Sequence, residues 1–331
     1  MGVHGVSFVD LNLDKKPEEK KKQIFIFSSI EDFKTWLADA LENDITDPYH
    51  IKLNIDSLGG HYNQQGSVGK LLKDNSEKYF IIDLLDSIIT NVENVSFYGL
   101  NNLVHMILPN STTVIGDQAF TSCKNLATIN IPASVTTIKD RVFHNCTNLT
   151  NITVDSNNNN FCSEDGVLYN KEKSVLIFCP PNKPGNTFTV PDTVIRLENY
   201  SIFANRNIEN LHLPNSIKGF GDQALSETNL INIVIPSGVT KIGANLFYVC
   251  RKLTSVTIPS SVTSIESQAF YNCSNLIEIV CERTTPPSMP GNNTIRNAHA
   301  NLQIKVPAAS VDAYKATNGW KAYAANIVAI E

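Results

Sequence analysis

The pair of side chains in this chain that first suggests catalysis is a histidine and a cysteine two residues apart, His144 and Cys146. A histidine base beside a cysteine thiol is an arrangement that nucleophilic catalysis uses. Cysteine recurs at the same place in three other segments, as Cys123, Cys250 and Cys273, and none of these has a histidine at the place of His144. The pattern therefore favours small apolar side chains that fill a core over catalytic thiols.

Metal-binding and cofactor-binding patterns are equally weak. The segment Asp155–Asn160 has enough side-chain oxygen for calcium, but it lacks the pattern of a calcium loop, and an Asx-rich turn explains it better. The seven cysteines include no C-x₂₋₄-C pair of the kind that binds zinc. There is no phosphate loop, and Gly66-Ser-Val-Gly69 lacks the spacing of a nucleophile elbow. We therefore predict no catalytic, cofactor-binding or metal-binding residues, and no enzymatic activity.

The elements that carry these residues repeat every 23 residues. Pro109 and Pro132 begin two successive copies, and each is followed at the same offsets by phenylalanine, cysteine, leucine and isoleucine. A fixed period of this length, carried by apolar residues, indicates a solenoid whose units bury a continuous core only by stacking. Further copies begin at Pro236 and Pro259 and, with weaker matches, at Asp86, Pro191 and Pro214.

Each copy predicts an inward-facing strand followed by turns. The run Leu126-Ala-Thr-Ile129-Asn-Ile131 has the L-x-x-I-x-I spacing of a leucine-rich-repeat strand, with its apolar side chains pointing into the solenoid. Pro132 cannot donate to a strand ladder, so it ends the strand. Residues 135–138 send a second apolar pair inward, and residues 140–146 predict a short helical or 3₁₀ turn. Phe143 and its equivalents are predicted to stack in a buried column.

The motif F-x-x-C-x-x-L-x-x-I-x-I-P-x-S-V-T-x-I resembles the BspA-like leucine-rich repeat family, and its clearest copy runs from Phe247 to Ile265. The resemblance covers roughly residues 86–281. It implies an α/β repeat solenoid of the right-handed leucine-rich-repeat type, with a parallel β-sheet, short helical or 3₁₀ turns, and N- and C-terminal caps. Members of the family are mostly bacterial cell-surface or secreted proteins, and those with a known role resemble adhesins. The family supplies no catalytic residues.

Four regions are predicted along the chain. A capping box at Ser28 and Glu31 is expected to open a helix in the first cap. Caps are needed because the last apolar layer of a solenoid would otherwise face water. The regions are a flexible polar tail at 1–22, an N-terminal cap with degenerate repeats at 23–85, the repeats at 86–281, and a C-terminal cap at 282–331.

An insertion at about 155–190 interrupts the period. Its residues 167–169 and 175–178 predict a β-hairpin. Insertions in repeat arrays often lie at a binding face, and they are as often tolerated loops. Cys162 and Cys179 flank the hairpin and are the best disulfide candidates, whereas the other cysteines are predicted to be free buried thiols.

Two side chains per strand point away from the core and form the best candidate binding surface. These positions are polar, short and nearly uncharged, so the face suits a glycan, an extended peptide or another sheet, and equally suits plain exposure to water. Aromatic and arginine hot spots are missing from it. The candidate binding residues are Thr128, Asn130, Asn151, Thr153, Asn210, His212, Asn232, Ser255, Thr257 and Glu278.

Charge and hydropathy narrow the partners and the location. The net charge of −5 argues against nucleic acid, because phosphate contacts need concentrated lysine and arginine. No run approaches the roughly 20 apolar residues of a membrane helix. The lysines of residues 15–22 are interrupted by Glu18 and Glu19 and indicate a solvated spacer. The start of the chain lacks a secretory signal, but the resemblance implies a secreted or cell-surface protein whose export signal is missing from this sequence.

Three functional hypotheses follow from these observations. The first is a monomeric, non-enzymatic, adhesin-like protein that recognises an extracellular protein or glycan through the solenoid surface. The second is a structural spacer or assembly module of a larger surface protein. The third, an enzyme with residues scattered over insertions, has the least support, because the sequence contains none of the catalytic motifs considered above.

Overall fold

The computed structural model describes residues 7–8, 23–291 and 293–331. It divides into two compact units, an N-terminal unit (Met1–Asp165) and a C-terminal unit (Gly166–Glu331). The predicted tail at residues 1–22 lies outside the described residues, except for β1 (Ser7–Phe8). This strand pairs antiparallel with β2 (Ile24–Phe27).

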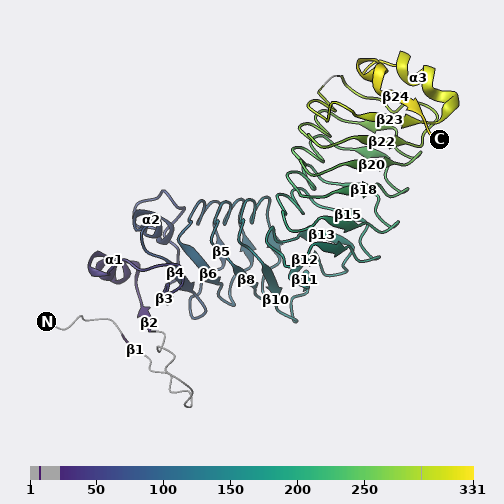
Figure 1. The fold of residues 1–331 in the computed structure, drawn as a ribbon. Coiled ribbons are helices and arrows are strands. Elements are labelled where there is room, and N and C mark those ends of the chain that lie inside the picture. Colours follow the sequence, from purple (N-terminus) through teal and green to yellow (C-terminus); the bar gives the residue numbers. More distant parts are fainter. Residues whose placement is uncertain (1–6, 9–22, 292) are drawn as a thin grey trace, which may run out of the picture. The chain divides into compact units, whose positions relative to one another are not determined.

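A parallel sheet forms one side of the N-terminal unit, with its strands side by side in chain order after β1 (Figure 1). Neighbouring strands of the regular copies are in register by one period, since Thr128 lies opposite Asn151 and Asn130 lies opposite Thr153. Alternate residues such as Ile129 and Ile152 are buried. The strands are β2, β3 (Tyr49–Leu53), β4 (Phe80–Asp83), β6 (Leu103–Ile107), β8 (Thr128–Ile131) and β10 (Asn151–Val154).

A second, shorter parallel ladder follows the turns after these strands. The sequence predicted only an inward apolar pair at this place in each copy. In the structure, this apolar pair forms a short strand that pairs in parallel with the equivalent strand of the neighbouring copy, for example at Ile115 and Ile138. Each copy therefore contributes two strands. In the N-terminal unit the short strands are β5 (Asn91–Val92), β7 (Val114–Ile115) and β9 (Thr137–Ile138).

The C-terminal unit repeats this plan, with a parallel sheet of seven strands ordered β14-β16-β18-β20-β22-β23-β24 (Figure 1). These strands are β14 (Thr187–Thr189), β16 (Asn210–His212), β18 (Asn232–Val234), β20 (Ser255–Ile258), β22 (Glu278–Cys281), β23 (Gln303–Val306) and β24 (Ile327–Ala329). Its short strands are β15 (Arg196–Leu197), β17 (Gly219–Phe220), β19 (Lys241–Ile242) and β21 (Ser264–Ile265). Parallel strands in successive repeats are the predicted leucine-rich-repeat architecture.

Stacked phenylalanines form the centre of each core, as predicted. Phe120 stacks on Phe97 with ring centroids 5.3 Å apart and on Phe143 at 6.0 Å. In the C-terminal unit Phe247 stacks on Phe270 at 5.4 Å. These rings are nearly or completely buried, and burying each one contributes roughly 2–3 kcal/mol.

The turns opposite the strands are two successive tight turns rather than a helix. In one copy the Arg141 carbonyl accepts from the His144 N–H, and the Phe143 carbonyl accepts from the Cys146 N–H, which is the 3₁₀ spacing. Two residues of these turns, Arg141 and Asn145, have positive φ values of 51° and 58°. Residues in the left-handed region cannot continue a helix, so of the two predicted forms, a short helical turn or a 3₁₀ turn, the structure has the 3₁₀ form.

Short helices lie at both ends of the chain. Helix α1 (Ile30–Asp39) is capped by Ser29, whose side chain accepts from the Asp32 N–H, so the predicted cap at Ser28 and Glu31 is wrong by one residue. The second helix near the N-terminus, α2 (Val68–Asp74), is capped by Ser67. The other end has η1 (Ala308–Ser310), α3 (Val311–Ala316) and η2 (Trp320–Asn326). The assignment of 23–85 and 282–331 as caps stays a prediction.

The insertion contains the predicted hairpin, in which β12 (Val167–Asn170) pairs antiparallel with β13 (Val175–Phe178). The sequence did not predict the strand that precedes it, β11 (Phe161–Glu164). The expected disulfide between Cys162 and Cys179 is wrong, because Cys179 is a free thiol. It is fully buried, and the Asn205 side-chain amide lies 4.0 Å from its sulfur.

Candidate binding site

The strand face of the N-terminal unit, meaning the outward side chains of β3 to β10, is largely bonded to itself. The Thr128 hydroxyl lies 2.7 Å from Nδ1 of His105 on the neighbouring strand. The Thr153 hydroxyl donates to Oδ1 of Asn130 at 3.1 Å. Three of the four candidate residues in this unit therefore already use their polar groups within the sheet, and Asn151 is the half-exposed fourth.

Charged side chains occupy the earlier strands of the same face. Lys52 Nζ lies 2.7 Å from Asp86 Oδ2, and His50 Nε2 lies 3.8 Å from Asp83 Oδ2. Burial alone would raise the pKa of Asp83, but His50, the Leu85 N–H and Lys52 together hold that pKa below its usual value. These contacts stabilise the carboxylate form and occupy it within the molecule.

The strand face of the C-terminal unit, meaning the outward side chains of β14 to β24, behaves differently. Asn210 lies opposite Asn232, and Asn232 lies opposite Ser255. In the part of the chain that the structure describes, no side-chain hydrogen bond involves these residues, His212 or Thr257. At one end of this face the Thr187 hydroxyl of β14 donates to Asn186 Oδ1 at 3.2 Å, and towards the other end Glu278 Oε2 and Lys305 Nζ form an ion pair of 2.6 Å.

A depression of about 360 Å³ lies over the carboxyl ends of β16, β18 and β20 in this unit. Four of the ten candidate residues line it: Asn210, His212, Asn232 and Thr257. The other two candidate residues of this unit, Ser255 and Glu278, lie on the same face outside the depression. The remaining four of the ten candidate residues lie in the N-terminal unit. The structure thus brings four predicted residues together into one hollow.

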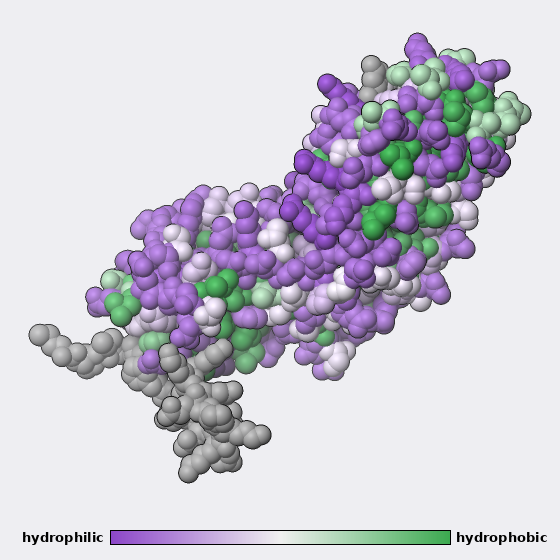
Figure 2. Space-filling model, viewed as in Figure 1, coloured by the Kyte–Doolittle hydropathy of each residue, from purple (hydrophilic) through white to green (hydrophobic). Residues whose placement is uncertain are grey.

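Incomplete strand pairing accompanies the depression. Strands β18 and β20 are in register at three residue pairs, whereas β16 and β18 are in register only at Asn210 with Asn232. Past that pair, Val234 is 66% exposed, an unusual exposure for a valine in the middle of a sheet. Hydrophobic residues lie among hydrophilic ones over β18 to β22 in Figure 2. The depression therefore has an accessible apolar patch within a polar surround.

Sequence reasoning missed the residues that the turns contribute to the lining. Asn215 and Ser237 each follow the proline that ends a strand, and Glu282 stands where the next copy would have its proline. The signal that would have found them is position, because the residues after parallel strands meet at one edge of the sheet. Glu282 is the only carboxylate among the described lining residues, which include no lysine or arginine.

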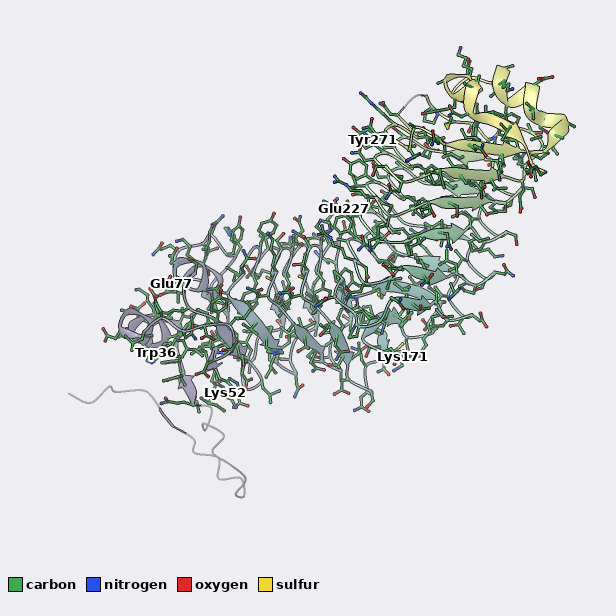
Figure 3. The ribbon with its side chains drawn as sticks, in the orientation of Figure 1. Trp36, Lys52, Glu77, Lys171, Glu227 and Tyr271 are labelled. Carbon is green, nitrogen blue, oxygen red and sulfur yellow. The ribbon has the colours of Figure 1, made fainter. Side chains whose placement is uncertain are left out.

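A second aromatic feature lies on the turn side of the C-terminal unit. Tyr248 and Tyr271 stack with ring centroids 5.4 Å apart, and Tyr271 points away from the strands in Figure 3. Both are half-buried. Because the rings cover each other's faces, they stabilise neighbouring copies more directly than they offer a surface to a ligand.

The repeat cysteines are not arranged for catalysis. Cys146 Sγ donates to the Phe120 carbonyl at 3.0 Å rather than to a histidine. Burial raises the pKa of Cys123 to about 12 and also raises that of Cys146. Burial lowers the pKa of His144, and Arg141 lowers it further. A protonated, buried thiol is a poor nucleophile, so the His144–Cys146 pair is not a catalytic dyad.

The asparagine-rich segment forms the predicted Asx turns. The Asp155 carboxylate accepts from the Asn157 N–H at 2.9 Å, and Asn158 Oδ1 accepts from the N–H groups of Asn160 and Phe161 at 2.8 Å each. Asn158 is buried and donates to the Pro132 carbonyl at 2.8 Å. These oxygens are committed to the backbone, which explains the segment without calcium.

Two further features are absent from residues 7–8, 23–291 and 293–331. No group of three or more histidine, cysteine, aspartate or glutamate side chains is placed to hold a metal ion. No helix is both long and apolar enough to cross a membrane.

Comparison with known proteins places these features in a family. The family model described as BspA type leucine rich repeat region matches six copies, over residues 76–173 and 181–286, which is more than half of the chain. The chain matches none of the curated proteins.

Solved structures from bacteria share the fold. The pneumococcal vaccine antigen PcpA is 19% identical, with a TM-score of 0.62 over 88% of this chain and 82% of that one. A leucine-rich cell surface protein from Faecalibacterium prausnitzii is 27% identical, with a TM-score of 0.52 over 67% of this chain and 63% of that one. A leucine-rich repeat protein from Bacteroides ovatus is 18% identical, with a TM-score of 0.53 over 100% of this chain and 82% of that one.

Proposed function

Because the chain belongs to the BspA-type leucine-rich repeat family, we propose that it is a non-enzymatic recognition protein that is secreted or held at the cell surface. In this proposal it acts as an adhesin and binds an extracellular protein or glycan through its strand face. The similarity to a cell surface protein from F. prausnitzii supports this location. Monomeric action is part of the proposal, since a solenoid can present its whole face without a second copy.

One observation carries the proposal. In the depression over β16, β18 and β20, the candidate side chains Asn210, His212, Asn232 and Thr257 make no side-chain hydrogen bond among the described residues. Polar groups that are gathered in a hollow and not used by the fold are available to a ligand. The equivalent positions of the N-terminal unit include two cross-strand hydrogen bonds. Binding is therefore assigned to the C-terminal face.

A structural spacer or assembly module is the second candidate function. The self-bonded face of the N-terminal unit favours it, because a face whose polar groups bond to each other is stable without a ligand. The two roles also coexist if the N-terminal unit supports a C-terminal unit that binds.

A binding assay of the full chain tests the proposal. The immobilised targets are extracellular-matrix proteins, cell-surface extracts and glycans. We expect saturable binding to at least one of these. Asn210→Lys and Asn232→Lys place a long charged side chain in the depression and should abolish that binding. Asn151→Lys, the matched change on the N-terminal face, should leave it intact.

Absence of saturable binding to every one of these materials would remove the recognition role and favour the spacer. Binding that persists in both Asn210→Lys and Asn232→Lys would instead move the site away from the depression. Circular dichroism of each variant checks that the fold is retained.

A further inference from the structure

We infer that the depression over β16, β18 and β20 is a binding site for an uncharged sugar residue of a glycan. The inference rests on the proposed recognition function and names the ligand class of its site. The depression holds about 360 Å³, near the lower end of the roughly 300–1,000 Å³ typical of small-molecule sites. A hollow of this size receives a small cyclic group rather than the side of a folded protein.

The polar groups around the depression match hydroxyl groups. Asn210 and Asn232 lie opposite each other in register on neighbouring strands. Thr257 and, from the turns, Asn215 and Ser237 also line the hollow. Amides and hydroxyls both donate and accept hydrogen bonds, as sugar hydroxyls do. Because these side chains have no hydrogen bond with other described residues, a ligand gains bonds here without breaking bonds within the sheet.

The charge of the lining selects an uncharged ligand. Glu282 is its single carboxylate, and among the described lining residues there is no lysine or arginine to offset it. Lys305 lies on the same face, but it is ion-paired with Glu278 at 2.6 Å. A sialylated or sulfated glycan would bring a negative charge towards Glu282 with no free cation among the lining residues. The site therefore disfavours anionic glycans and accepts neutral ones.

The apolar part of the depression matches the carbon–hydrogen face of a sugar ring. Val234 is 66% exposed at the place where β16 and β18 stop pairing. Pro236 and Pro259 also line the hollow. A pyranose ring has hydroxyls around its edge and C–H groups on its face, so it can cover Val234 while its edge reaches the amides. Removing this valine surface from water adds favourable free energy.

A protein ligand fits the same site less well. An extended peptide that binds by adding a strand needs a free sheet edge, and β16, β18 and β20 all lie inside the sheet between other strands. Protein interfaces concentrate their energy in tryptophan, tyrosine and arginine, and none of these is among the described residues that line the depression. The lining therefore favours a sugar over a protein hot spot.

An array of neutral and sialylated oligosaccharides, probed with the full chain, tests the inference. We expect saturable binding to neutral members and none to their sialylated counterparts. Val234→Trp fills the depression and should weaken that binding at least about tenfold, whereas Asn232→Ala removes an amide and should weaken it about five- to tenfold. Asn151→Ala, at the equivalent strand position of the N-terminal unit, is the matched control and should change nothing.

Binding to neutral glycans that is insensitive to both Val234→Trp and Asn232→Ala would overturn the site. Binding only to sialylated glycans, or to none on the array, would overturn the ligand class. The recognition function is tested separately with cell-surface extract treated with glycosidase or with protease. Binding lost only after protease leaves recognition standing and rejects the sugar site, and binding lost only after glycosidase supports both. Asn232→Ala keeps the test valid if Val234→Trp fails to fold.

Discussion

The strand faces of the two units have the same repeat positions but use their polar side chains in different ways. On the N-terminal face, Thr128 bonds to His105 and Thr153 bonds to Asn130 across neighbouring strands. On the C-terminal face, Asn210 and Asn232 occupy the same kind of position and have no side-chain hydrogen bond among the described residues. The same repeat positions are therefore bonded across the strands in one unit and left unbonded in the other.

The difference teaches that the bonding of the strand face is set locally, between one pair of strands at a time. Side chains that lie opposite each other in a parallel sheet are close enough to bond when their groups are complementary. Where that bonding coincides with full strand pairing, as between β8 and β10, the face is continuous. Where β16 and β18 pair at a single position, the strands leave a hollow and Val234 becomes exposed.

The largest expected effect tests whether the two cores are as alike as the repeat implies. Phe120→Ala in the N-terminal unit and Phe247→Ala in the C-terminal unit should each lower the free energy of unfolding by about 3–5 kcal/mol, because each removes a buried stacked ring. Urea denaturation followed by circular dichroism measures both. Phe120→Leu and Phe247→Leu, as milder controls, should lose less. A large loss in only one unit would show that the faces differ because the cores beneath them differ.

The next largest effect compares how the free energy of unfolding depends on pH through one buried thiol in each unit, Cys123 and Cys250. Folding raises the pKa of Cys123 from 9.0 to about 12 through burial. For Cys250, burial raises the pKa to about 11, with the Thr228 hydroxyl opposing the rise. The folded state holds each thiol protonated. The contribution of each thiol's raised pKa to the free energy of unfolding is therefore fully present below pH 9.0. It is then lost as the pH rises, by about 1.4 kcal/mol per pH unit.

Cys123→Ala and Cys250→Ala should therefore each flatten the alkaline loss of unfolding free energy. The flattening from Cys250→Ala should end near pH 11, and that from Cys123→Ala should continue to about pH 12. Denaturant titrations at half-unit steps of pH measure the two slopes. Unchanged slopes in both variants would mean that these thiols titrate as freely in the folded chain as in the unfolded one.

The repeat made much of the fold predictable because apolar residues recur in a fixed order. The phenylalanine column, the cysteine core positions and the hairpin at 167–178 were all predicted from residue type and spacing. The second ladder was not, since two-residue strands such as β9 are too short to show alternation. The short helical or 3₁₀ turn was predicted in its 3₁₀ form, whereas the positive φ values within it were not, since left-handed residues such as Arg141 have no distinctive side chain.

The candidate binding site was less predictable than the fold. Its strand residues, such as Asn210 and Asn232, followed from alternation, because side chains on one strand point alternately inwards and outwards. The depression itself depends on how far β16 and β18 pair, which no residue pattern reports. Glu282 was missed because it stands where the repeat has proline, at the first residue of the predicted C-terminal cap, outside the alternating strand positions.

The smallest expected effect measures the contrast between the faces directly. Thr128→Val removes the hydroxyl that bonds to His105, and it should lower the free energy of unfolding by about 1 kcal/mol. Thr257→Val makes the same change in the depression, where the hydroxyl has no hydrogen bond with other described residues. Because valine suits a strand at least as well as threonine, this change should stay within about 0.5 kcal/mol.

Paired urea titrations of the two variants, each against the unchanged chain, provide the measurement. A loss in Thr257→Val as large as that in Thr128→Val would mean that the Thr257 hydroxyl already contributes to the fold, and the two faces would then be equivalent. A clear loss in Thr128→Val alone would show that the C-terminal face keeps its polar groups at no benefit to stability. Groups that stability does not require, gathered around an exposed valine in a hollow, are the groups that a ligand is expected to use.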